Sequence, residues 1–129
     1  MKKLLQFFER NNLVSVKNLG WGLVLMTAVF LIMGGVQKVI GTEQMVNNFT
    51  FMKLENYRIW IGGLEILGAL LLVIPKTSSY GAVLISTIMG GAVALHLSLM
   101  QGNGFQAAVI LAVCAWVGHC LRKYGLFNL

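Results

Sequence analysis

One carboxylate inside an apolar stretch most constrains how this chain can fold. The residues from Ile59 to Pro75 are apolar over about 17 positions, close to the roughly 20 that a helix needs to cross the hydrocarbon core of a bilayer. Glu65 lies inside this stretch. An ionised carboxylate facing lipid costs about 2.5–3.5 kcal/mol, so Glu65 has to face protein or a cavity. Gly62 and Ala69 share its helical stripe, where small residues let another helix come close.

The composition is that of a membrane protein. Of the 129 residues, 57% are apolar and 11% are charged, whereas about 25% are charged in soluble domains. The net charge is +6, and the basic residues lie mostly at the ends of apolar segments. Basic residues at the ends of membrane spans determine the topology and contact anionic lipid. The expected partner is therefore the lipid bilayer, and no nucleic-acid partner is expected.

Four apolar segments have the character of membrane spans. They are expected near residues 19–40, 57–75, 79–100 and 105–121. Residues 1–18 are expected to form either a short helix on the membrane surface or a disordered tail. The chain is predicted to be a single transmembrane domain over residues 1–129, an all-α integral membrane protein built as a four-helix bundle.

The connections and the basic residues predict the topology. Short links make the second, third and fourth spans antiparallel neighbours. Basic residues are more frequent in the N-terminal tail, at Lys76 and after the last span than in the connection that holds Lys53 and Arg58. Because Lys and Arg mark the cytoplasmic side, both termini are expected in the cytoplasm.

Three ionisable residues on three spans are the candidate ligand-binding residues. Lys38 lies near the end of the first span, Glu65 within the second and His96 about one turn from the end of the third. Their similar depth predicts that they meet around one cavity in the outer half of the bundle. We expect Glu65 to be hydrogen-bonded to His96, directly or through water, because a lysine near a helix end extends toward the membrane surface. Each residue also has a structural explanation, as an interfacial side chain or as an acid that ties helices together.

The remaining chemistry-bearing residues predict no second site. His119 lies near the opposite end of the last span, too far away to join the other three residues. Cys114 and Cys120 do not share a helix face, so they form neither a CxxC motif nor a metal pair. The sequence shows no metal-ligand set, nucleophile triad or phosphate loop. No metal is expected, and no catalytic residue can be assigned.

Four short motifs carry a family resemblance. They are Gly-Gly-Val-Gln-Lys at 34–38, Gly-Gly-Leu-Glu-Ile-Leu-Gly at 62–68, Pro75 followed by Tyr-Gly-Ala at 80–82, and Met-Gly-Gly-Ala at 89–92 leading to His96. With these motifs the chain resembles the DoxX-like family of small four-helix bacterial membrane proteins over about residues 19 to 121. The resemblance implies a multi-pass protein of the bacterial inner membrane. The family takes its name from a subunit of an archaeal thiosulfate:quinone oxidoreductase, and some relatives resemble partners in redox or oxidative-stress complexes. Lys38 and Glu65 are carried over only as motif positions.

Three functions remain open at this point. The first is a quinone-interacting subunit or accessory module of a membrane redox system, with no covalently bound cofactor and with quinone held by polar groups in an apolar groove. The second is a transporter of a small solute or of protons, because buried acids mark such pathways. The third is a non-catalytic scaffold that assembles a partner. Small residues on the third span, at Ser86, Gly90 and Ala94, would allow a homodimer or contact with other redox-complex subunits.

Overall fold

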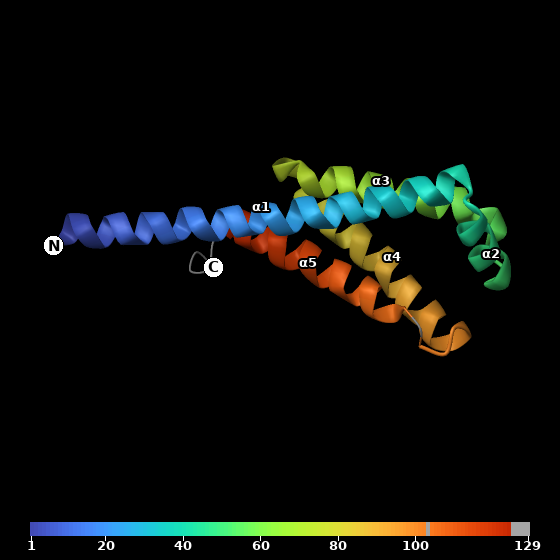
Figure 1. Cartoon of the computed structure of the whole chain (residues 1–129). Helices are drawn as coiled ribbons and strands as arrows, with labels where there is room; N and C mark the ends of the chain where they lie inside the picture. Colours follow the sequence, from blue (N-terminus) through green and yellow to red (C-terminus); the bar gives the residue numbers. More distant parts are fainter. Residues whose placement is uncertain (103, 125–129) are drawn as a thin grey trace.

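The computed structural model describes residues 1–102 and 104–124, and this part of the chain is helical without a strand. Five α-helices and two 3₁₀ turns follow one another along the chain (Figure 1). Their bounds are α1 Lys2–Ile40, α2 Glu43–Phe51, η1 Glu55–Tyr57, α3 Arg58–Val73, η2 Pro75–Thr77, α4 Ser78–Leu99 and α5 Phe105–Tyr124.

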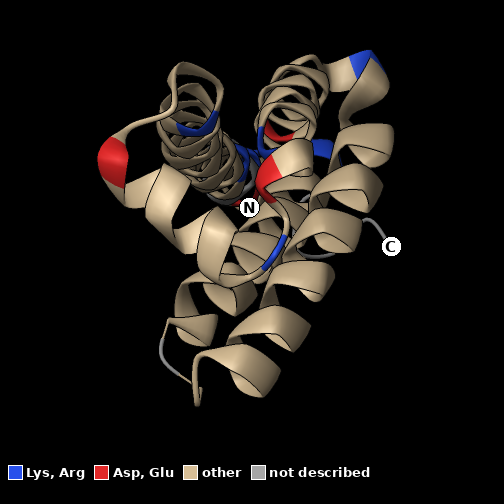
Figure 2. Ribbon diagram, turned by 90° about the vertical axis from the view of Figure 1, so that its right-hand side faces the viewer, with Lys and Arg blue, Asp and Glu red and all other residues tan. Residues whose placement is uncertain are grey.

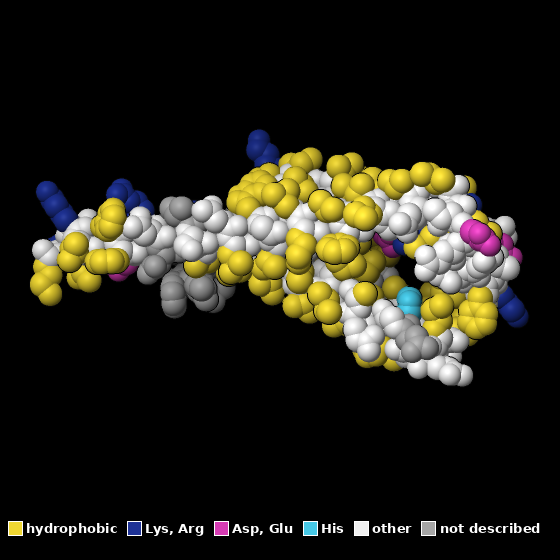
Figure 3. Space-filling view, in the orientation of Figure 1, with side chains coloured by type: hydrophobic (Ala, Val, Ile, Leu, Met, Phe, Trp, Pro, Cys, Tyr) yellow, Lys and Arg dark blue, Asp and Glu magenta, His cyan; other side chains and the backbone are white. Residues whose placement is uncertain are grey.

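Four of these helices, α1, α3, α4 and α5, are long and apolar enough to cross a membrane. α3, α4 and α5 lie at the residues where spans were expected, and α1 ends at Ile40, as the first span was expected to do. Large apolar side chains such as Leu25, Trp60 and Leu97 are exposed on the outside of the bundle. Figure 3 shows hydrophobic side chains over much of this surface, which suits contact with lipid rather than with water. The protein is a multi-pass membrane protein.

The N-terminal residues are not a separate element. Residues 2–18 form the first part of α1, which is one continuous helix of 39 residues. The expectation of a surface helix or a disordered tail was therefore wrong. No glycine or proline occurs between Lys2 and Leu19, so nothing in that stretch interrupts the helical hydrogen bonds. In Figure 1 this part of α1 extends well beyond the other helices.

The spanning helices pack in a ring, with α1 against α3 and α5, and α4 against α3 and α5. Half of the buried core residues are alanine, which allows the helices to approach closely. The core residues are Val24, Ala28, Leu31, Ala69, Leu72, Ala82, Ile85, Met89, Ala108 and Ala115. Toward the end where α2 lies, α4 and α5 diverge from α1 and α3 (Figure 1), and Figure 2 looks onto this open end of the bundle.

The opposite end is closed by direct backbone contacts. A Cβ atom added at Gly20 would lie 2.4 Å from the backbone nitrogen of Arg122 on α5. A Cβ atom at Gly81 would lie 2.4 Å from the backbone nitrogen of Leu72 on α3. Real Cβ atoms do not approach other atoms so closely, so only glycine allows this packing.

A side chain of α5 completes the C-terminal end of α3. Pro75 follows this helix and cannot continue it, so the last carbonyl groups of α3 need other donors. The Arg122 guanidinium donates to the carbonyl oxygens of Leu72 and Val73 at 2.7 and 2.8 Å. The Thr77 hydroxyl donates to a third carbonyl of α3 at 2.9 Å. These bonds tie α3, α5 and the α3–α4 turn together at the closed end.

Two adjacent glycines of α3 give a matched test of how closely α1 and α3 approach. A Cβ atom at Gly62 would lie 2.7 Å from the carbonyl oxygen of Gly35 in α1, whereas a Cβ atom at Gly63 would meet nothing within 4 Å. We expect Gly62→Ala to lower the free energy of unfolding by about 1–3 kcal/mol through overpacking. Gly63→Ala should leave it unchanged or raise it by up to about 1 kcal/mol, because alanine favours a helix.

Thermal unfolding of both variants in the same detergent measures this difference. An equal loss of stability in the two variants would contradict the close approach of α1 and α3.

Candidate functional site

A cavity of about 450 Å³ lies at the open end of the bundle and is lined by residues of all five α-helices. Figure 3 shows the surface hollowed between α2 and the end of the α4–α5 hairpin. The walls are mainly apolar, with large side chains that include Phe30, Leu31, Phe49, Ile61, Ile88, Leu95, Met100 and Leu111. The polar side chains that line it are Lys38, Asn48, Glu65, Thr87 and His96.

The structure brings the three candidate residues of the sequence analysis to this one cavity. Lys38 lies in the last turn of α1, Glu65 lies about two turns into α3, and His96 lies in the last turn of α4. Three separate helices therefore supply the ionisable groups that line one cavity. Their meeting agrees with the expectation from depth, and their binding of a ligand stays a prediction.

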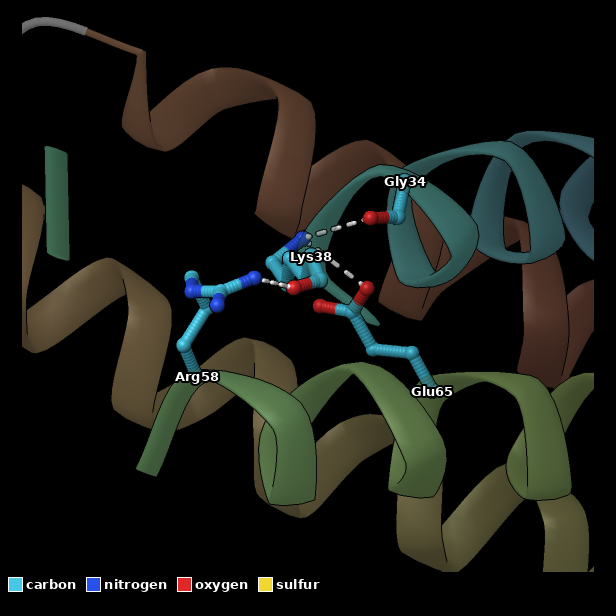
Figure 4. Close-up of polar contacts among 4 residues, drawn as sticks. All are labelled: Gly34, Lys38, Arg58 and Glu65. Carbon is cyan, nitrogen blue, oxygen red and sulfur yellow. Dashed lines mark hydrogen bonds and ion pairs between the residues drawn. The ribbon is translucent and has the colours of Figure 1, made fainter. Parts of the chain in front are cut away.

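Lys38 and Glu65 form an ion pair between α1 and α3. The Lys38 ammonium nitrogen lies 2.9 Å from Oε2 of Glu65 and 3.4 Å from the carbonyl oxygen of Gly34 (Figure 4). Glu65 is only 5% exposed. The pair neutralises a carboxylate that would otherwise be an isolated charge inside the bundle.

The direct partner of Glu65 is thus Lys38, so the expectation of a direct hydrogen bond to His96 was wrong. A helical side chain leans toward the N-terminal end of its own helix. The stem of Lys38 accordingly folds back along α1, toward Gly34 and the middle of the bundle, instead of extending outward. The close packing of Gly35 on Gly62 brings α1 and α3 near enough for the two charges to meet.

Arg58 completes the C-terminal end of α1. Its guanidinium Nη1 donates to the carbonyl oxygen of Lys38, one of the groups that lack a helical donor (Figure 4). Just beyond, Gly41 has a left-handed backbone with φ of 81°, and the chain turns there into α2. Arg58 therefore binds backbone at the C-terminal end of α1, while Lys38 neutralises Glu65.

His96 has a defined hydrogen-bonding role. Its Nδ1 lies 2.8 Å from the carbonyl oxygen of Ala92, one turn earlier in α4. A carbonyl oxygen only accepts, so Nδ1 carries a hydrogen, and in the tautomer with its hydrogen on Nδ1 the other nitrogen, Nε2, is an acceptor. Among the described residues, Nε2 has no hydrogen-bond partner. Gly104 lies against the ring, and a Cβ atom added there would lie 3.2 Å from Nε2.

Sequence reasoning did not name Met45 or Asn48 of α2 as residues of the site. Met45, Asn48, Phe49 and Met52 line the cavity, and their i, i+3, i+4, i+7 spacing forms one face of a helix. That periodicity is visible in the sequence and could have identified this face. The half-buried Asn48 amide adds a donor and an acceptor to the wall. The hydroxyl hydrogen of Thr87 is already used within α4.

His119 does not line this cavity, in agreement with its expected place near the other end of the last span. Its Nδ1 lies 2.7 Å from Oγ of Ser78, and both side chains are buried. The contact joins α5 to the start of α4 at the closed end. Within residues 1–102 and 104–124, no three His, Cys, Asp or Glu side chains are grouped so that they could hold a metal ion.

A comparison with protein families shows which family the chain belongs to. The model of the DoxX-like family matches residues 22–118, a region that contains Lys38, Glu65 and His96. The chain belongs to the DoxX-like family. No curated protein and no solved structure matches it. The part of α1 that precedes residue 22 lies outside the region matched by the DoxX-like family model.

The ion pair of this DoxX-like protein should behave as one coupled unit. Glu65→Leu leaves the Lys38 ammonium in a mainly apolar wall, and we expect it to lower the free energy of unfolding by about 3 kcal/mol. The double variant Lys38→Met with Glu65→Leu removes both charges, so most of that loss should be recovered. Unfolding of the wild type, both single variants and the double variant in one detergent gives the coupling energy. A double variant whose loss equals the sum of the two single losses would show that the charges do not interact.

Proposed function

We propose that this DoxX-like protein binds a quinone in the cavity at its open end, as a subunit or accessory module of a membrane redox or oxidative-stress system. The observation that carries the proposal is the position of the Lys38–Glu65 pair and His96 on the wall of one mainly apolar cavity. A quinone combines an apolar ring and tail with two ring oxygens. The apolar wall suits the ring, and the polar groups suit its oxygens.

The size of the cavity supports a ligand of this class. About 450 Å³ falls within the roughly 300–1,000 Å³ that is usual for small-molecule sites. Such a volume holds a quinone ring and the first part of its tail, and the remaining tail would lie among the apolar side chains of the bundle and lipid. In this proposal the chain binds and orients the quinone, and electrons pass between the quinone and a partner subunit.

A matched pair of variants tests the proposal. Purified wild-type protein should carry quinone in its lipid extract and should bind a short-chain ubiquinone in calorimetric titrations. Glu65→Gln removes the charge that holds Lys38 in place, and we expect it to weaken binding about tenfold, the effect of about 1.4 kcal/mol. The control Glu55→Gln makes the same chemical change at an exposed residue that does not line the cavity, and it should bind as the wild type does.

Two outcomes would overturn the proposal. One is the absence of quinone from the extract together with the absence of binding. The other is full affinity in a stably folded Glu65→Gln variant. If liposomes containing the wild type showed a proton flux without quinone binding, the transport function would replace the proposed one.

We also propose an antiparallel arrangement in the bacterial inner membrane with both termini in the cytoplasm. The ends that would face the cytoplasm carry Lys76, Arg122, Lys123 and the basic residues of the first part of α1. The opposite side carries Lys53 and Arg58, offset by two acids. This bias follows the positive-inside rule.

Cysteine labelling tests this topology. In a background with Cys114→Ala and Cys120→Ala, we compare Lys2→Cys in α1 with Asn47→Cys in α2, both at exposed positions. A reagent that cannot cross the membrane should label Asn47→Cys in intact cells and Lys2→Cys only after permeabilisation. Labelling of Lys2→Cys in intact cells would reverse the orientation.

A further inference from the structure

The hydrogen-bonding groups on the cavity wall include more than one free acceptor. One is Nε2 of His96, because Nδ1 carries the ring hydrogen and is bonded within α4. Another is on Glu65, because Lys38 pairs with Oε2 and the second carboxylate oxygen accepts no hydrogen bond from a described residue. These two acceptors belong to residues of α4 and α3 that line one cavity.

The donors on the same wall are already partly used. The Lys38 ammonium has three hydrogens, of which one is directed to Glu65 and one to the carbonyl oxygen of Gly34. The Asn48 amide of α2 can donate or accept. A ligand that only accepts therefore finds donors at Lys38 and Asn48 but offers nothing to His96.

The two oxidation states of a quinone differ in this respect. The oxidised form has two carbonyl oxygens, which only accept hydrogen bonds. The reduced form, a quinol, has two hydroxyl groups, each of which donates one hydrogen bond and can still accept. Only the quinol can satisfy the free acceptors of His96 and Glu65.

We infer that the cavity binds the quinol in preference to the quinone, and that His96 is the residue that determines this preference. The inference rests on the function proposed above and adds the redox state of the ligand to it. An oxidised ring would displace water from Nε2 of His96 without replacing the lost hydrogen bond. Sites built to accept from a ligand hydroxyl reject analogues that lack it, because a buried polar group is then left unpaired.

The preference also has an electrochemical consequence. If the quinol binds about tenfold more tightly than the quinone, the midpoint potential of the bound two-electron couple rises by about 30 mV relative to the free couple. The site would then favour reduction of a quinone and retain the reduced product.

Anaerobic calorimetric titrations of the detergent-purified full chain test the inference. The probes are a short-chain ubiquinone and the same molecule after chemical reduction to the quinol. We expect the Kd of the quinol to be about tenfold lower in the wild type. His96→Phe keeps an aromatic ring but removes the acceptor, and the ratio of the two Kd values should fall to about one.

Two further variants control the measurement. Glu55→Gln changes a polar residue that is exposed and does not line the cavity, so the ratio should stay as in the wild type. His96→Gln offers an amide acceptor and should keep part of the preference for the quinol. It serves as the test variant if His96→Phe is poorly folded.

The outcomes separate this inference from the proposed function. Equal affinities for the two forms, or tighter binding of the quinone, overturn the inference and leave quinone binding in place. A wild-type preference that persists in His96→Phe shows that His96 does not determine it. If neither form binds, the proposed function fails and the inference fails with it.

Discussion

The ion pair between Lys38 and Glu65 is the interaction on which the open end of the bundle depends. A carboxylate in an apolar span is tolerated only if its charge is compensated inside the protein. Lys38 can do this because α1 and α3 meet backbone to backbone at Gly35 and Gly62. The pair therefore constrains the distance and the rotation of the two helices, and it holds Glu65 at the cavity wall.

The two ends of the bundle are held together by different means. At the closed end, Arg122 and His119 make polar contacts with α3 and α4, and glycines let the backbones touch. The hairpin of α4 and α5 contains no Asp, Glu, Lys or Arg from Ser78 to Leu121, so its described residues bring no acidic side chain and no Lys or Arg to the open end (Figure 2). There it is held mainly by apolar packing, and Phe49 of α2 is buried in the space that the divergence leaves. The cavity is a consequence of this asymmetry.

The sequence predicted the spans well because length and hydropathy dominate the choice of a membrane helix. Depth along each span also predicted that Lys38, Glu65 and His96 meet. Depth counts backbone positions only, so it could not predict that the stem of Lys38 turns back toward Glu65. The cap that Arg122 forms on α3 could not be predicted, because its acceptor Val73 lies 49 residues away along the chain.

The paired charges on the cavity wall favour a neutral ligand. The Lys38 ammonium and the Glu65 carboxylate already compensate each other, so the wall presents little net charge. A charged ligand would have to compete with one partner of this pair and leave the other uncompensated, at a cost of several kcal/mol. The bond from His96 to Ala92 is local to α4 and does not depend on a ligand, so Nε2 is oriented in advance. A neutral molecule with hydroxyl groups keeps the ion pair intact and meets an acceptor that needs little further ordering.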